Sequence, residues 1–247
     1  MAKANFIVET PVIDDGLRAY MLKIYVYMGL ALVLTGVVAM TCAQSQAFLN
    51  AMYVMANDGG VALRPLAWLV MLAPLVLAIV TGFGLKSINA AMAQAIYWLY
   101  AVLMGASLSM IFLTFTGESI ALVVFIAAGT FGGMSLYGYT TRRSLTGWGS
   151  FLLMALIGLI LTMVVNVVLN SSALMLFLSV AGVLVFTGLT AFDTQRLKAR
   201  YNGAAGTGED REKIAIIGAL TLYLDVINLF LNLLNLFGGR RLGRQSS

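Results

Sequence analysis

Two aspartates lie within or beside apolar stretches near the end of the chain, and they offer the clearest chemistry in the sequence. Asp225 is surrounded by the hydrophobic run of residues 222–234. A carboxylate placed in hydrocarbon costs about 2.5–3.5 kcal/mol on insertion scales. Such a residue persists only where it faces the interior of a helical bundle, meets a partner or lines a wet path. We therefore predict a functional role for Asp225.

Asp193 allows two interpretations. It follows an apolar stretch in the sequence Phe-Asp-Thr-Gln, and Thr190 lies three residues before it on the same helical face. Because Arg196 and Lys198 come directly after it, Asp193 could form an ordinary interfacial ion pair, worth about 0–1 kcal/mol. It could equally be a second functional acid, and the residues alone leave both interpretations open.

Polar residues recur on one face of the segment that carries Asp225. The stripe consists of Thr221, Asp225, Asn228, Asn232 and Asn235, at spacings of 4, 3, 4 and 3. Residues three or four apart share a face of a helix. Lipid cannot satisfy such a stripe, so it must face protein or water. We interpret it as pore lining or helix contact, and for the asparagines we favour interhelical hydrogen bonds of about 0.6–2 kcal/mol each.

The composition places these residues in a membrane. The 247 residues are 61% hydrophobic and 10% charged, whereas soluble domains carry about 25% charged residues. A helix crosses the hydrocarbon core with about 20 apolar residues. The chain is therefore predicted to be an all-α polytopic membrane protein in the lipid bilayer. Its predicted spans are 21–43, 65–85, 92–114, 119–140, 149–169 and 173–193, with a seventh apolar segment at 214–237.

These segments form one membrane domain, residues 21–237, between an N-terminal tail (1–20) and a basic C-terminal tail (238–247). Lys and Arg gather in the N-terminal tail and in the loops after the second, fourth and sixth spans. That bias places the N-terminus in the cytoplasm. The net charge of +5 reflects these loops, and no basic run interleaved with aromatics indicates a nucleic-acid partner.

The C-terminal tail conflicts with this orientation. A full seventh crossing would place Arg240, Arg241 and Arg244 outside the cytoplasm, against the positive-inside rule. Either the last segment does not cross fully, or it crosses as a buried central helix that ignores the charge bias.

Small residues at a spacing of four predict close packing between helices. One such ladder contains Ala101, Gly105 and Ser109, and a second contains Gly129 and Gly133. We assign both ladders to packing and neither to chemistry.

The composition also excludes several mechanisms. Histidine is absent, which removes His-dependent hydrolases and the HExxH zinc site. Cys42 is the only cysteine, so it forms no intrachain disulfide and is interpreted as a small buried hydrophobe. We expect neither an enzyme nor a bound cofactor.

Around the two aspartates the chain resembles bacterial members of the Bax inhibitor-1 family, also called the transmembrane Bax inhibitor motif family. The resemblance lies in the Phe-Asp-Thr-Gln core of residues 188–198 and in Thr-Leu-Tyr-Leu-Asp-Val-Ile-Asn-Leu-Phe at residues 221–230. The second motif is specific, because ten residues around a buried acid rarely recur by chance. In the first, Phe192 stands where bacterial relatives often have tyrosine. The likeness covers nearly the whole chain.

The resemblance implies six helices around a central seventh. It also implies a calcium-leak path in the bacterial inner membrane, gated by Asp193 and Asp225 as a pH-sensing pair that meets the permeant calcium. Some relatives hold the closed state with an arginine near the end of the second helix. Here Lys86 lies in that region, and a lysine lacks the bidentate fork of arginine. We expect a monomer that has calcium and other membrane proteins as partners.

The chemistry of a paired acid fits this implication. Two carboxylates within hydrogen-bond reach in a low-dielectric site cannot easily both ionise, so they titrate as a unit. Sharing a proton would tie the sixth span to the seventh segment, and losing it would push them apart. Calcium prefers oxygen ligands. The prediction is a passive, pH-gated calcium leak.

Three other functions stay open. The chain could be a non-conducting regulator that binds membrane proteins involved in stress or proteolysis and uses the aspartates as a latch. It could be a proton-coupled antiporter. An intramembrane aspartyl protease also places aspartates on adjacent helices, but such enzymes typically carry Gly-x-Gly-Asp and Pro-Ala-Leu motifs, and this chain has no proline after Pro74.

Overall fold

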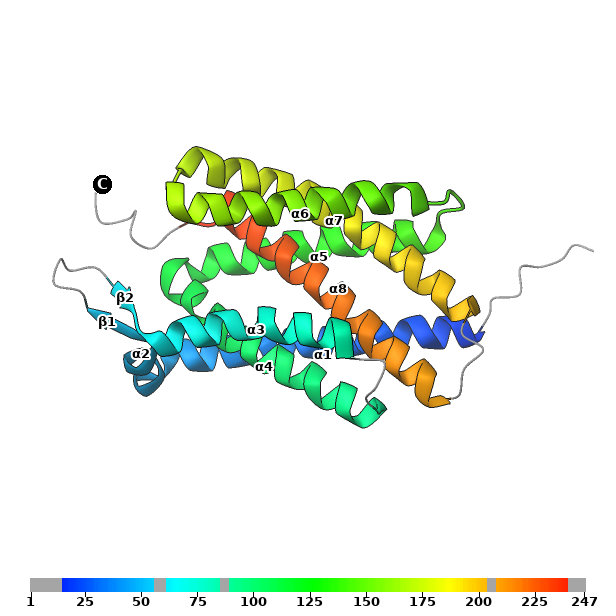
Figure 1. Ribbon diagram of the computed structural model, residues 1–247, viewed down its shortest axis with the longest axis horizontal. Helices are drawn as coiled ribbons and strands as arrows, with labels where there is room; N and C mark the ends of the chain where they lie inside the picture. Colours follow the sequence, from blue (N-terminus) through cyan, green and yellow to red (C-terminus); the bar gives the residue numbers. More distant parts are fainter. Residues whose placement is uncertain (1–14, 56–60, 85–88, 204–207, 240–247) are drawn as a thin grey trace, which may run out of the picture.

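A computed structural model describes residues 15–55, 61–84, 89–203 and 208–239 of the chain (Figure 1). The described part is almost entirely helical, as predicted. Its elements are α1 (Asp15–Gln44), α2 (Gln46–Met52), β1 (Tyr53–Met55), β2 (Val61–Leu63), α3 (Pro65–Gly84), α4 (Ala90–Thr114), α5 (Gly117–Thr140), α6 (Thr146–Leu169), α7 (Ser172–Gly203) and α8 (Gly208–Phe237).

Capping residues set the start of two membrane helices. The Asn89 Oδ1 accepts a hydrogen bond from the Met92 backbone N–H at 2.8 Å, at the start of α4. The Thr116 hydroxyl accepts one from the Ser119 N–H at the start of α5. These bonds satisfy amide groups that have no partner in the first turn of a helix. Both helices therefore begin two residues before the apolar segments predicted from the sequence.

Among the described residues, six helices are long and apolar enough to cross a membrane: α1, α4, α5, α6, α7 and α8. They match six of the predicted segments, and the chain is a polytopic membrane protein. The predicted segment 65–85 is also helical as α3, which has 20 residues and contains Pro74.

The last helix, α8, occupies the middle of the molecule and crosses it diagonally (Figure 1). It packs against α1, α4, α5 and α7. The other two helices have their main contacts elsewhere, α3 with α4 and α6 with α7. Four helices thus surround α8 directly. Helices α3 and α6 lie outside these four, whereas the family resemblance implied that all six helices surround the central one.

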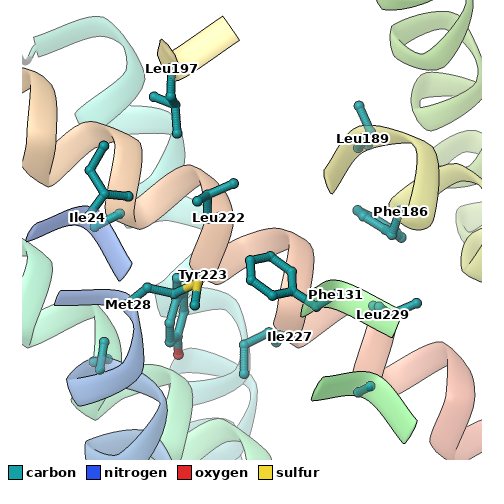
Figure 2. Packing of buried hydrophobic residues seen from close by; sticks show 14 of the residues in the cluster. Ile24, Met28, Phe131, Phe186, Leu189, Leu197, Leu222, Tyr223, Ile227 and Leu229 are labelled. Atoms are coloured by element: carbon teal, nitrogen blue, oxygen red, sulfur yellow. The ribbon is translucent and has the colours of Figure 1, made fainter. Parts of the chain in front are cut away.

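Burial distinguishes α8 from the other candidate spans. In its most apolar window 56% of the residues are buried, compared with 28% or less in the other five. Leu222 and Tyr223 are completely buried. Figure 2 shows these two residues of α8 with Met28 of α1 and Phe131 of α5 in the hydrophobic core. A helix that carries polar residues is thereby kept away from lipid.

The position of the end of α8 shows whether the last predicted segment extends across the whole bundle, which the basic C-terminal tail had left open. The Gly239 carbonyl accepts a hydrogen bond from the Thr116 N–H at 3.1 Å, and the Gly239 N–H donates to the Ser119 Oγ at 2.9 Å. The connection from α4 to α5 lies at the end of the bundle opposite the start of α1 (Figure 1). Helix α8 therefore runs the length of the bundle as a buried central helix. The residues that caused the conflict, Arg240, Arg241 and Arg244, lie outside the described residues.

The segment between the first two predicted spans contains more regular structure than expected. It forms the short helix α2 and the antiparallel pair of β1 and β2, in which Tyr53 lies opposite Leu63. Helix α1 begins at Asp15, six residues before the predicted span, because the charges of Asp15 and Arg18 interrupt the apolar run that located the span, although Leu17 and Tyr20 between and after them are buried.

The two ladders of small residues differ in the structure. Ala101 and Ser109 are buried, and a Cβ on Gly105 would collide with the Thr35 carbonyl of α1. This ladder packs closely, as predicted. A Cβ on Gly129 or Gly133 would meet nothing within 4 Å. The packing predicted for the second ladder was wrong, because these glycines lie on the exposed side of α5.

Candidate functional site

Asp225 lies in the middle of α8 and is buried among the helices that surround it. Only 4% of the residue is exposed, and its Oδ2 has no hydrogen-bond partner in the described part of the chain. More than nine in ten buried polar groups in proteins are hydrogen-bonded. An orphaned carboxylate oxygen inside a membrane domain is therefore exceptional, and it marks this position as chemically unusual.

Asp193 lies on α7, a helix that packs directly against α8. It is 8% exposed, and its neighbours Thr190 and Thr194 are completely buried. The structure thus places the two predicted acids on adjacent, packed helices, both buried, and leaves the Asp225 Oδ2 without a hydrogen-bond partner in the described residues.

Arg196 and Arg200 follow Asp193 on α7 within two helical turns. Neither forms a salt bridge with Asp193 in the described residues, whereas Lys23 pairs with Glu212 and Lys213 with Glu209. Lys198 donates instead to the Tyr139 carbonyl at 2.9 Å. A closed interfacial ion pair with Arg196 or Lys198, the simpler interpretation of Asp193, is not formed in this structure.

The rest of the polar stripe bonds to its own helix. The Thr221 hydroxyl donates to the Ile217 carbonyl, the Asn228 amide to the Leu224 carbonyl and the Asn232 amide to the Asn228 carbonyl, at 2.8–3.0 Å. These bonds differ from the interhelical ones that we expected. Asn232 does meet a neighbouring helix by packing, because its amide lies against Gly182 of α7. Asn235, one turn later, is exposed.

A chain of hydroxyl groups beside Asp193 joins three helices, and we did not predict it from the sequence. The Tyr25 and Ser135 hydroxyl oxygens are 2.6 Å apart, and those of Ser135 and Thr194 are 3.0 Å apart. Ser135 is 3% exposed and Thr194 is completely buried. We call Tyr25, Ser135 and Thr194 the hydroxyl clasp. It ties α1 and α5 to the residue that follows Asp193.

A second hydroxyl contact ties α8 to α1 and α4. The Thr35 and Tyr223 hydroxyl oxygens are 2.8 Å apart, and the Thr35 hydroxyl lies 3.0 Å from the Ala101 carbonyl, to which it donates. Tyr223 stands two residues before Asp225. The only sequence signal for these contacts is a hydroxyl within an apolar helix, which must find a partner. Because the partners lie on distant helices, no spacing along the chain reveals them.

The described residues contain no group of three or more His, Cys, Asp or Glu side chains that could hold a metal ion. Asp193 and Asp225 are thus a set of two acids, fewer than the ligands of a tight calcium site. Lys86, the predicted latch, lies outside the described residues.

Comparison with known proteins agrees with the motifs around the two acids. A family model described as "Inhibitor of apoptosis-promoting Bax1" matches residues 17–242. The inner membrane protein YbhL of Escherichia coli K12 is 43% identical over 228 residues, which cover 92% of this chain and 94% of YbhL. The protein RP147 of Rickettsia prowazekii is 46% identical over 228 residues, 92% of each chain. With a matching family model over most of its length and relatives of this similarity, the chain belongs to the Bax inhibitor-1 family.

Proposed function

We propose that the protein is a pH-sensitive calcium leak of the bacterial inner membrane, gated by Asp193 and Asp225. The observation that supports the proposal is the buried Asp225 carboxyl group, one oxygen of which has no hydrogen-bond partner in the described residues, on a helix that packs against the helix carrying Asp193. Burying two acids in this way lowers the stability of the fold. A function that uses its titration explains why it is present.

The pair can act as a switch because it lies between two packed helices. Two facing carboxylates that share one proton attract, and two that are both ionised repel. The protonation state of the pair therefore alters how α7 packs against α8. The hydroxyl clasp begins at Thr194, next to Asp193, so a movement of α7 would be transmitted to α1 and α5.

Calcium suits this site as a passing ion. It binds oxygen ligands, and tight sites supply six to eight of them. The two carboxylates provide at most four oxygens, and the asparagine and threonine oxygens of α8 are spread along the helix at about 1.5 Å per residue, so they cannot all reach one ion. Conduction requires binding that is strong enough for entry and weak enough for release, so an incomplete set of ligands is compatible with a leak and not with a resident metal.

The proposal includes a topology and a location. We infer seven crossings, with α3 as one of them, and an N-terminus in the cytoplasm. The charge bias of the loops supports that orientation, and the end of α8 beside Thr116 supports the seventh crossing. The name of YbhL as an inner membrane protein supports the location.

Calcium flux into liposomes that contain only this protein tests conduction. A fluorescent calcium indicator inside the vesicles should report entry down a calcium gradient, above the rate in empty vesicles. A non-conducting regulator would give no flux above empty vesicles. An antiporter would give flux that is driven by an imposed proton gradient at equal calcium on both sides, and a passive leak would not.

A further inference from the structure

Helices α1 and α5 leave a groove between them that the proposed calcium function does not use. A cavity of about 390 Å³ is lined by Leu22 and Tyr25 of α1 and by Phe131, Gly132 and Leu136 of α5. A second cavity, of about 300 Å³, is lined by α1, α5, α4 and α8, and Phe131 lines both cavities. We call the first cavity the α1–α5 groove.

The groove lies at the level of the bilayer. Both of its walls belong to helices that are long and apolar enough to span a membrane, and apolar side chains make most of its lining. Leu22 and Leu136, at its rim, are 53% and 64% exposed. Hydrocarbon is therefore the medium that faces the groove, and a lipid acyl chain is the occupant with the matching chemistry.

Positive charge marks one end of the groove. Arg18, in the first turns of α1, is exposed and lines the groove, as does Tyr139 near the end of α5. The Lys198 ammonium lies 5.2 Å from the centre of the Tyr139 ring. Basic side chains at a membrane surface attract anionic headgroups, and a guanidinium can hold a phosphate with two hydrogen bonds.

Gly132 leaves space for a lipid acyl chain because it has no side chain. A Cβ on Gly132 would meet nothing within 4 Å, so the α5 wall is open at this point. Gly129, one turn earlier, is equally open but does not line the groove. The floor carries the Tyr25–Ser135 hydrogen bond of the hydroxyl clasp.

We propose that the α1–α5 groove binds one anionic phospholipid, with its phosphate on Arg18 and an acyl chain against Gly132 and Phe131. The bound lipid would cover the clasp from the membrane side. The proposal does not depend on calcium conduction, and it would stand for a non-conducting regulator as well.

Lipid retention by the full chain tests this site. The protein, delipidated in detergent, is incubated with phosphatidylglycerol or with phosphatidylcholine of identical acyl chains, and retained lipid is counted by native mass spectrometry. The wild type should retain one phosphatidylglycerol per chain and lose phosphatidylcholine. Arg18→Gln should lose the preference for phosphatidylglycerol, and Gly132→Leu, which fills the groove, should retain neither lipid.

Two control variants keep the test specific. Gly129→Leu adds the same side chain outside the groove, and Arg64→Gln removes a positive charge that does not line it, so both should retain phosphatidylglycerol like the wild type. Equal retention of the two lipids by the wild type would overturn the headgroup contact. Equal retention by Gly132→Leu and Gly129→Leu would overturn the groove as the site.

Discussion

Asp225 on α8 and Asp193 on α7 lie on two helices that pack directly against each other. Both residues are buried, and Oδ2 of Asp225 has no hydrogen-bond partner in the described residues. Around them, hydroxyl groups tie α7 to α1 and α5, and tie α8 to α1 and α4. The two acids thus lie on the helices that these hydroxyl contacts join to α1, α4 and α5.

Ser135 is the central member of the hydroxyl clasp, so its removal breaks two contacts at once. Ser135→Ala should lower the free energy of unfolding by about 1–3 kcal/mol, because the Thr194 hydroxyl is left buried without this partner. Ser179→Ala serves as a control, since Ser179 is equally buried but donates to the Met175 carbonyl of its own helix. Denaturant unfolding in detergent measures both variants. Equal effects would show that the clasp does not hold the helices together.

Gly138 marks the closest approach of α5 to α7 near the site. A Cβ at this position would collide with the Ala191 backbone carbonyl, two residues before Asp193. Gly138→Ala should therefore destabilise the protein by about 1–3 kcal/mol, as overpacking does. Gly129→Ala, at an open position of the same helix, should change stability by a few tenths of a kcal/mol at most or increase it. A thermal unfolding scan of the pair that shows no difference would contradict the close approach.

The asparagines of α8 should contribute little to holding helices together. Because the Asn228 amide bonds to the Leu224 carbonyl of its own helix, Asn228→Leu should change the free energy of unfolding by less than about 1 kcal/mol. Thr35→Val is the contrast, since it removes bonds to both α4 and α8 and should cost about 1–3 kcal/mol. A larger loss for Asn228→Leu than for Thr35→Val would indicate an interhelical bond at Asn228.

Much of the fold could be predicted from residue types alone. Apolar segments locate membrane helices because the bilayer fixes their length, and the stripe through Asp225 correctly indicated a helix buried among others. The ladder at Gly105 was predictable for the same reason. Gly129 and Gly133 show the limit, because identical spacing can mark either a close contact or an exposed face.

The site was less predictable than the fold. The motifs around Asp193 and Asp225 pointed to both acids, but the contacts that surround them join residues far apart in the sequence. Ser135 and Thr194 are 59 residues apart, and Thr35 and Tyr223 are 188 apart. A hydroxyl in an apolar helix indicates that a partner exists, and only the packing of the helices determines which residue it is.

The pH profile of calcium flux tests the central claim, that the Asp193–Asp225 pair gates a calcium path, most directly. Liposomes would carry the wild type, Asp193→Asn, Asp225→Asn or the control Glu118→Gln, which removes an exposed acid from the first turn of α5. The account predicts that flux through the wild type and Glu118→Gln changes with pH in parallel, while each aspartate variant gives a flat profile. An unaltered flux and pH response in either aspartate variant would contradict it.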